Sequence, residues 1–334
     1  MCSGTIANYR YLGHVYRQMK YLAIHPVRLS RYRYRLSAAA FTGLLLCGAV
    51  TSSVSRASAI PAGCARITHG GHSADQERTS FDRIIVTAGS GGGTLTATSQ
   101  SLTGTTADAG PDLADAASVL LLAALTGHHD AACSSWLENE GRSAETTLAA
   151  SHNLSLNWSG VSVKRGALHI GIGSTRLTLQ NGGASADATL SVSGVSVSGV
   201  ATPSLMPSSA TASFTLPQGE LAPLMAATAG KTATLPAVHV TISSLTAQRD
   251  TIELSGNGRA TLTGETDNTS ASGHLEVRDI SALIDHARQD GQMKIATALI
   301  LARMVSHKAD GGNTWDTTWE GGVLTVNGVP LPLK

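Results

Sequence analysis

The stretch that decides the fold runs from Gly273 to Lys334 and reads GHLEVRDISALIDHARQDGQMKIATALILARMVSHKADGGNTWDTTWEGGVLTVNGVPLPLK. Its first residues alternate between polar and apolar side chains up to Val277, as in a β-strand with one buried face. Apolar residues then recur every three or four positions, which predicts a long amphipathic helix over 279–307. Gly291 interrupts this helix, at a cost of about 1 kcal/mol relative to alanine. Two short alternating runs after the helix predict a hairpin over 315–326.

The chain before this stretch favours an antiparallel sheet. Apolar and polar residues alternate in short runs separated by turns from Asn153 to Val200, and again from Val238 onward. The second face of these runs carries mostly Ser, Thr and Gly. The Asn-Gly pair at 257–258 is typical of a tight hairpin and predicts a turn there. We therefore expect a mainly β (α+β) fold with antiparallel, curved meander sheets.

A second amphipathic helix is predicted over 111–125. Pro111 suits the first helical position, Gly127 suits the position after the last turn, and Asp112 and Asp115 favour the positive end of the helix dipole. The fold thus carries two amphipathic helices, and we expect the longer one, 279–307, to pack on the sheet.

Four regions follow the N-terminal 59 residues. We expect a flexible segment over 60–80, because it is polar and rich in turn-forming residues. A β-rich region with the helix follows over 81–200, and a proline-rich connection over 201–236 forms the softest boundary. The last region, 237–334, holds the second meander, the long helix and the C-terminal hairpin.

Residues 1–59 have the features of an export signal. All 23 acidic residues lie beyond this segment, whereas eight of the 24 basic residues lie within it. An apolar run of about 13 residues, Ala38–Val50, follows the basic stretch, and Ala57-Ser58-Ala59 predicts cleavage before Ile60. The run is shorter than the ~20 residues that span a bilayer, so an uncleaved anchor is the alternative rather than the expectation. Met19 is an alternative start. These features predict a periplasmic protein.

Removal of this segment leaves 16 basic residues against 23 acidic ones, a net charge near −7. An acidic chain argues against nucleic acid as a partner, because phosphate binding needs clustered Lys and Arg. Of the four cysteines, Cys64 and Cys133 remain after cleavage. In an oxidising compartment this pair predicts a single disulfide, with two free buried thiols as the alternative.

Motifs for catalysis, cofactors or metals are not found in the sequence. The glycine run 89–93 lacks the Lys-Ser/Thr of a phosphate-binding loop, and no G-x-S-x-G frame occurs. The histidine pair 128–129, even with His69 and His72, has no further ligand placed by spacing, and zinc needs three or four convergent ligands. We therefore expect no enzyme activity, no cofactor and no metal.

The C-terminal stretch resembles the end of exported alphaproteobacterial proteins grouped as domain-of-unknown-function 2125. The residues that carry this resemblance are Gly273, Leu275, Leu283, Leu324, Asn327, Gly328 and Pro330. It implies an exported, β-rich body that closes with a strand, a helix and a hairpin, and it implies no catalytic residues. More distantly, the layout resembles AsmA-like envelope proteins, whose curved sheets cradle lipid.

These observations favour a non-catalytic envelope protein that binds an apolar ligand or lipid between the curved sheet and the helix over 279–307. Its partner would be lipid or another envelope protein. The alternative for the helix is that it only fills the core. The alternative function is a structural or adhesive surface protein, favoured by the Ser, Gly and Thr of residues 187–200. The expected groove lining is Leu283, Ile284, Ile295, Leu299, Val305, Trp315 and Trp319.

Overall fold

A computed structural model describes residues 60–331 with the exception of 76–77, 152, 231–235, 264–267 and 310. All described residues belong to one compact unit. The export signal expected over 1–59, with its alternative start at Met19, lies outside the described residues.

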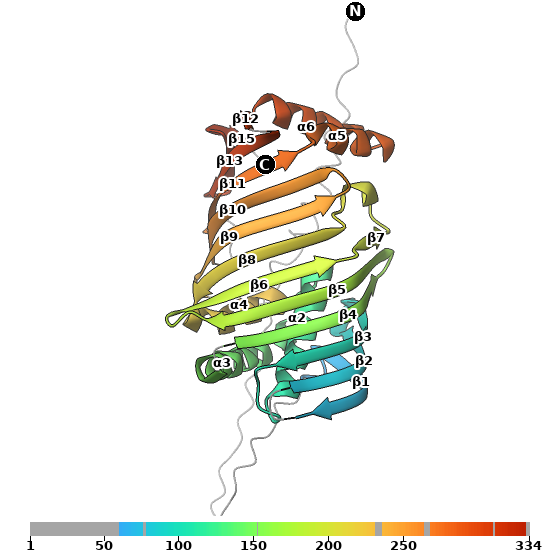
Figure 1. Ribbon diagram of the computed structural model, residues 1–334, viewed down its shortest axis with the longest axis vertical. Coiled ribbons are helices and arrows are strands. Elements are labelled where there is room, and N and C mark those ends of the chain that lie inside the picture. Colours follow the sequence, from blue (N-terminus) through green and yellow to red (C-terminus); the bar gives the residue numbers. More distant parts are fainter. Residues whose placement is uncertain are drawn as a thin grey trace, which may run out of the picture. The chain divides into compact units, whose positions relative to one another are not determined.

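The described chain forms a single open, curved antiparallel sheet of 15 strands (Figure 1). The strands follow one another across the sheet in chain order, except that β7 pairs with β5 and β12 pairs with β13. The expected mainly β class is thereby confirmed. The strands are β1 (Ala65–Ala74), β2 (Arg78–Ala88), β3 (Thr94–Thr103), β4 (Asn153–Arg165), β5 (Leu168–Asn181), β6 (Ser185–Ser193), β7 (Ser196–Ser198), β8 (Ser209–Pro217), β9 (Val238–Arg249), β10 (Ile252–Leu262), β11 (Ser270–Arg278), β12 (His307–Ala309), β13 (Gly312–Glu320), β14 (Val323–Val326) and β15 (Val329–Leu331).

Two groups of helices cover the two ends of the sheet (Figure 1). The first group is α2 (Gly110–Thr126), α3 (Ser134–Ser151) and α4 (Leu221–Ala229), which pack with β1–β6 and β8 around the larger hydrophobic core. The second group is α5 (Ile280–Gln289) and α6 (Met293–Met304), which pack with β11 and β13 around a smaller core.

The strand register places both helix groups on the same face of the sheet. Directly opposed residues of antiparallel strands point to the same side. One such row crosses the sheet through Leu177, Leu190, Ala212, Leu245, Gly256, Leu275 and Trp315. Leu177 packs on the larger core, whereas Leu275 and Trp315 belong to the smaller one. A row of apolar side chains and one glycine therefore crosses this face from β5 to β13, and its middle lies between the two helix groups.

The helix expected over 279–307 is two helices. α5 ends at Gln289 and α6 begins at Met293. Between them Gly291 has φ +72°, a left-handed conformation that ends a helix and that glycine adopts without steric cost. The interruption predicted at Gly291 is thus a full break.

The segment expected to be flexible, 60–80, and the expected proline-rich connection, 201–236, both contribute strands to the sheet. The segment 60–80 contains β1, which pairs with β2 from Ala65 to Ala74. Its polar composition does not indicate this backbone pairing. The segment 201–236 contains β8 and α4, and β8 pairs with both β6 and β9. The sheet therefore continues through the expected boundary.

The turn predicted at Asn257-Gly258 is wrong, because β10 runs through both residues. Asn257 opposes His274 and Gly258 opposes Gly273 in the ladder with β11. The glycine is needed for close strand approach: a Cβ at Gly258 would lie 2.5 Å from the carbonyl oxygen of Ser272. A bulge against β9 between Gly256 and Gly258 accommodates the irregularity.

Candidate functional site

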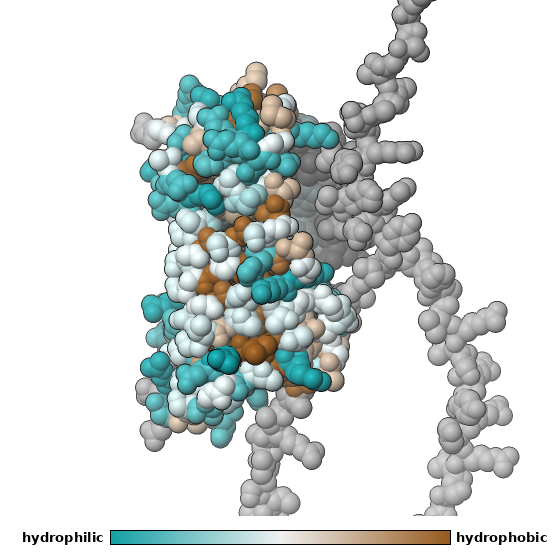
Figure 2. All heavy atoms as spheres, turned by 90° about the vertical axis from the view of Figure 1, so that its right-hand side faces the viewer, coloured by the Kyte–Doolittle hydropathy of each residue, from teal (hydrophilic) through white to brown (hydrophobic). Residues whose placement is uncertain are grey.

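An apolar cavity of about 230 Å³ lies between the sheet and the helices α2 and α4. The helix α2 supplies Leu113, Ala117, Leu120, Leu121 and Ala124, α3 supplies Ala144, and α4 supplies Leu221, Leu224, Met225 and Thr228. The strands β3, β4, β5, β6 and β8 supply Leu102, Leu154, Leu156, Trp158, Thr175, Leu177, Leu179, Leu190 and Phe214. Figure 2 shows hydrophobic residues reaching the surface in the middle of one side of the molecule, between more hydrophilic ends.

The helix α2 forms one wall of the cavity, and its two ends are well defined. Pro111 occupies the first turn, and Gly127 follows the last turn at φ +63° with its N–H donating to the carbonyl of Ala123. Arg165 of β4 donates to the carbonyl of Thr126 at 2.5 Å, which ties this end of the helix to the sheet. The helix expected over 111–125 is confirmed, and its apolar stripe lines the cavity.

The second wall, α4, is held by α3. The carboxylate of Glu145 accepts a hydrogen bond from the N–H of Ala222 at 3.0 Å, in the first turn of α4. Gly141 allows the two helices to touch, since a Cβ there would lie 2.4 Å from the Cα of Ala222. At the other end of α4, the carbonyl of Ala229 accepts from the N–H of Asp130 at 2.9 Å.

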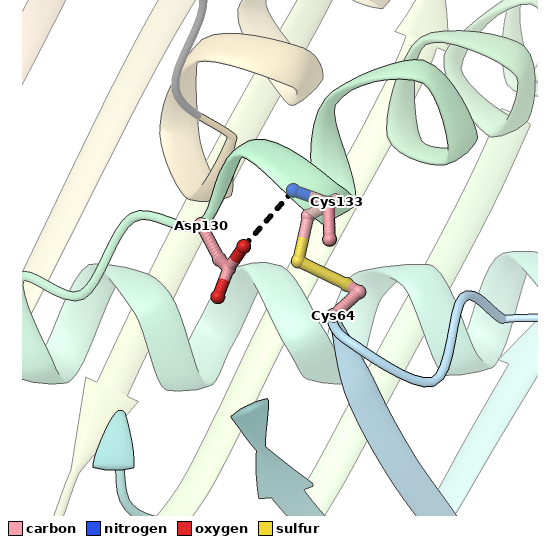
Figure 3. Close-up of a disulfide and its surroundings, with 4 residues drawn as sticks. Cys64, Asp130 and Cys133 are labelled. Carbon is pink, nitrogen blue, oxygen red and sulfur yellow. Dashed lines mark hydrogen bonds between the residues drawn. A yellow bond between two sulfur atoms is a disulfide. The ribbon is translucent and has the colours of Figure 1, made fainter. Parts of the chain in front are cut away.

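A disulfide joins this helical layer to the first strand. Cys64, just before β1, and Cys133, between α2 and α3, form the disulfide predicted for this pair, across a sequence separation of 69 (Figure 3). The Asp130 carboxylate beside it accepts from the N–H of Ala132 at 2.9 Å. Both cysteines are buried in the larger core, so the bond fixes the turn from which α3 starts.

Few polar atoms face the cavity, and most of them are satisfied. The indole N–H of Trp158 donates to the hydroxyl of Ser118 at 3.1 Å, and the hydroxyl of Thr228 donates to the carbonyl of Leu224 at 2.8 Å. The hydroxyl of Thr175 is the exception: it is buried and has no hydrogen-bond partner within the described part of the chain. Thr175 is thus the one unsatisfied polar group of the cavity wall.

A group of carboxylates lies between the start of α2 and the middle of α3. Glu140 is 5% exposed, and its pKa is raised to about 7, first by burial and then by the charges of Asp112 and Asp115. The pKa of Asp112 is raised too, by burial and by Asp115. Asp115 pairs with Nε2 of His69 at 2.8 Å. This group makes the helical layer sensitive to pH near neutrality.

The residues predicted to line a groove are distributed differently. Ile284 and Trp315 are buried in the smaller core, and Leu283 and Leu299 pack against it. Ile295 and Val305 are exposed, and Trp319 is half-buried on β13. The cavity instead uses α2 and α4. The signal for it was the wide apolar stripe of residues 113–125 together with the run LAPLMAATA at 221–229.

The histidines considered as metal ligands have other neighbours. The rings of His69 and His72 stack on Phe81, with centroids at 4.1 and 4.9 Å. Within the described ranges, no group of three or more His, Cys, Asp or Glu residues is placed to hold a metal ion.

Among the helices of the described part, none is both long and apolar enough to cross a bilayer. The chain matches no family model, no curated protein and no solved structure with which it was compared. The resemblance of residues 273–334 to the exported family therefore stays a prediction.

Proposed function

We propose that this chain is an exported, non-catalytic protein of the cell envelope that binds an acyl chain in the cavity under α2 and α4. The observation that supports this most directly is the composition of the cavity wall, which apart from Thr175, Thr228 and the nitrogen of Trp158 is purely apolar. Such a wall selects ligands by the hydrophobic effect rather than by hydrogen bonds.

The size of the cavity limits the ligand. An apolar cavity of about 150 Å³ holds benzene, and a water molecule, close in size to a methylene group, takes up roughly 30 Å³. The cavity of about 230 Å³ would thus hold on the order of eight chain carbons. A longer chain would continue over the half-buried Ala212, Leu245 and Ala247, on the same face between the two helix groups.

Thr175 adds a polar requirement. A buried hydroxyl without a partner costs about 1–3 kcal/mol, and a ligand that hydrogen-bonds it would recover this energy. We therefore favour a ligand with a polar group, such as the carboxyl group of a fatty acid, over a plain alkane.

Quenching of tryptophan fluorescence tests the proposal. Trp158 lines the cavity, whereas Trp315 lies in the smaller core. A fatty acid brominated near mid-chain should quench the wild-type protein and the Trp315→Phe variant at the same concentrations. In Trp158→Phe the quenching should fall sharply, because Trp136, which also lies in the larger core, does not line the cavity. Equal quenching in both variants, or none in the wild-type protein, would rule out this cavity as the binding site.

A structural or adhesive surface protein is the second candidate. The face opposite the helices carries Ser and Thr in register, as in the row Ser191, Thr211, Thr246 and Ser255. Protease treatment of intact cells separates the two candidates, because only a surface protein would be degraded.

A further inference from the structure

The helix α6 exposes large apolar side chains that no described element covers. Met293 is 61% exposed, Leu301 57% and Met304 75%, and Ile300 between them is 36% exposed. Met304, Met293 and Leu301 are the three most exposed large apolar residues of the described chain. Isolated apolar residues at a surface are normal, whereas a contiguous group marks an interaction site.

The four side chains lie on one face of the helix. At about 100° per residue, Met293, Ile300, Leu301 and Met304 fall within an arc of roughly 100°. The opposite side packs on the smaller core through Ala296, Leu299 and Ala302, and the carbonyl of Ala302 accepts from the indole N–H of Trp315 at 2.8 Å. The helix is thus fixed by one side and presents an apolar stripe on the other.

Basic residues border this stripe. On the same helical projection, Lys294 and Arg303 lie roughly 80–100° from the centre of the stripe, one on each side. Lys308 follows in β12 and is exposed. Between Gly291 and Ala309 the sequence contains no carboxylate. This segment is therefore a local positive region on a chain whose described part is acidic.

We propose that α6 is an interfacial helix that lies flat on an anionic lipid bilayer. An apolar face immersed at the boundary of headgroups and acyl chains, with Lys and Arg along its edges, is the arrangement that binds such surfaces. Each cation near the surface strengthens binding to acidic lipids. The proposal concerns a different surface from the cavity and does not depend on the acyl-chain proposal.

A second copy of the chain fits this stripe less well than a bilayer does. A two-fold contact would bring Lys294 and Arg303 close to the same residues of the other copy, so like charges would meet. The stripe is also small: α6 is about 18 Å long and about 10 Å wide, which gives a footprint on the order of 200 Å². A stable protein interface buries roughly 800 Å² on each partner.

Vesicle flotation with the purified protein tests the assignment. We expect it to float with vesicles that contain phosphatidylglycerol, to float much less with pure phosphatidylcholine, and to be released by high salt, which screens exposed charges. Met304→Glu should lower binding about tenfold or more by placing a charge in the apolar layer. Lys294→Gln should lower binding about fivefold on the anionic vesicles only.

Val323→Glu is the matched control, because Val323 is a 44% exposed apolar residue of β14 outside the stripe. It should bind like the wild-type protein.

The proposal is overturned if the wild-type protein does not float with anionic vesicles, or if Met304→Glu and Val323→Glu behave alike. It is also overturned if light scattering shows that the wild-type protein is a dimer and that Met304→Glu is a monomer. If Met304→Glu does not fold, the charge dependence of Lys294→Gln decides the question. Quenching of Trp158 by the brominated fatty acid should be the same in Met304→Glu, Lys294→Gln and Val323→Glu as in the wild-type protein.

Discussion

Replacing Glu140 with glutamine removes the most perturbed titrating group of the helical layer while keeping the shape of the side chain. In the wild-type protein, burial and the charges of Asp112 and Asp115 raise the pKa of Glu140 from 4.5 to about 7. Between these two values the folded protein keeps a proton that the unfolded chain has lost. The free energy of unfolding therefore falls as the pH rises from about 4.5 to about 7, and the full cost of the charge is present above pH 7.

The magnitude follows from the size of the shift. Each pKa unit corresponds to about 1.4 kcal/mol, so the ionised Glu140 costs on the order of 3 kcal/mol at pH 8 and about 1 kcal/mol at pH 5. Glutamine carries no charge at either pH. We expect Glu140→Gln to raise the free energy of unfolding by about 3 kcal/mol at pH 8 and by about 1 kcal/mol at pH 5.

Urea unfolding at the two pH values, followed by circular dichroism, measures this difference. Glu138→Gln is the control, because Glu138 is exposed on the same helix and pairs with Arg142. Loss of that exposed pair should cost roughly 0.5 kcal/mol at both pH values. A gain for Glu140→Gln that is equal at pH 5 and pH 8, or a loss at pH 8, would show that the carboxyl group is not the source of the pH dependence.

Three further outcomes are expected. Replacing Cys64 and Cys133 by serine should lower the free energy of unfolding by about 4 kcal/mol, given their separation of 69 residues, and reduction of the wild-type protein should have the same effect in urea titrations. Thr175→Val should stabilise the ligand-free protein by about 1 kcal/mol in the same assay, because it removes an unsatisfied hydroxyl, and a loss of stability would show that the hydroxyl is bonded. Asp279 accepts from the hydroxyl of Thr251 and from the N–H of Ala282, which lower the pKa of its carboxyl group. Asp279→Ala should therefore lower the melting temperature at neutral pH, and this difference should vanish as the pH falls through the lowered pKa.

The strands were largely predictable because alternation reports burial directly. Leu154, Leu156 and Trp158 point to the core, and their polar neighbours do not, which a periodic pattern records residue by residue. β1 escaped prediction because an edge strand needs backbone partners more than apolar side chains. The Asn257-Gly258 pair misled because the same small glycine suits a turn and a tight strand contact.

The helix α3 was missed for a different reason. Its buried residues Leu137, Ala144 and Leu148 recur at helical spacing, yet Glu140, Gly141 and charged neighbours lie among them. Gly141 allows α3 to contact α4, and Glu140 lies near the carboxylates of Asp112 and Asp115. The reason for each residue therefore lies in an element that is distant in sequence. The cavity was missed because its walls, α2 and α4, lie far apart in the sequence and come together only in the fold.

The meander topology also bears on how the sheet assembles. In the main sheet path, each strand pairs with the strand that precedes it and the one that follows it in that path, and every pairing is antiparallel. Pairings between segments close in sequence lower the relative contact order and need little loop closure. A chain delivered from one end can therefore add strands successively to an existing edge, without waiting for its C-terminus. Closure of the Cys64–Cys133 bond needs only residues up to α3, so it can lock the first core while β4 and later strands are still unpaired.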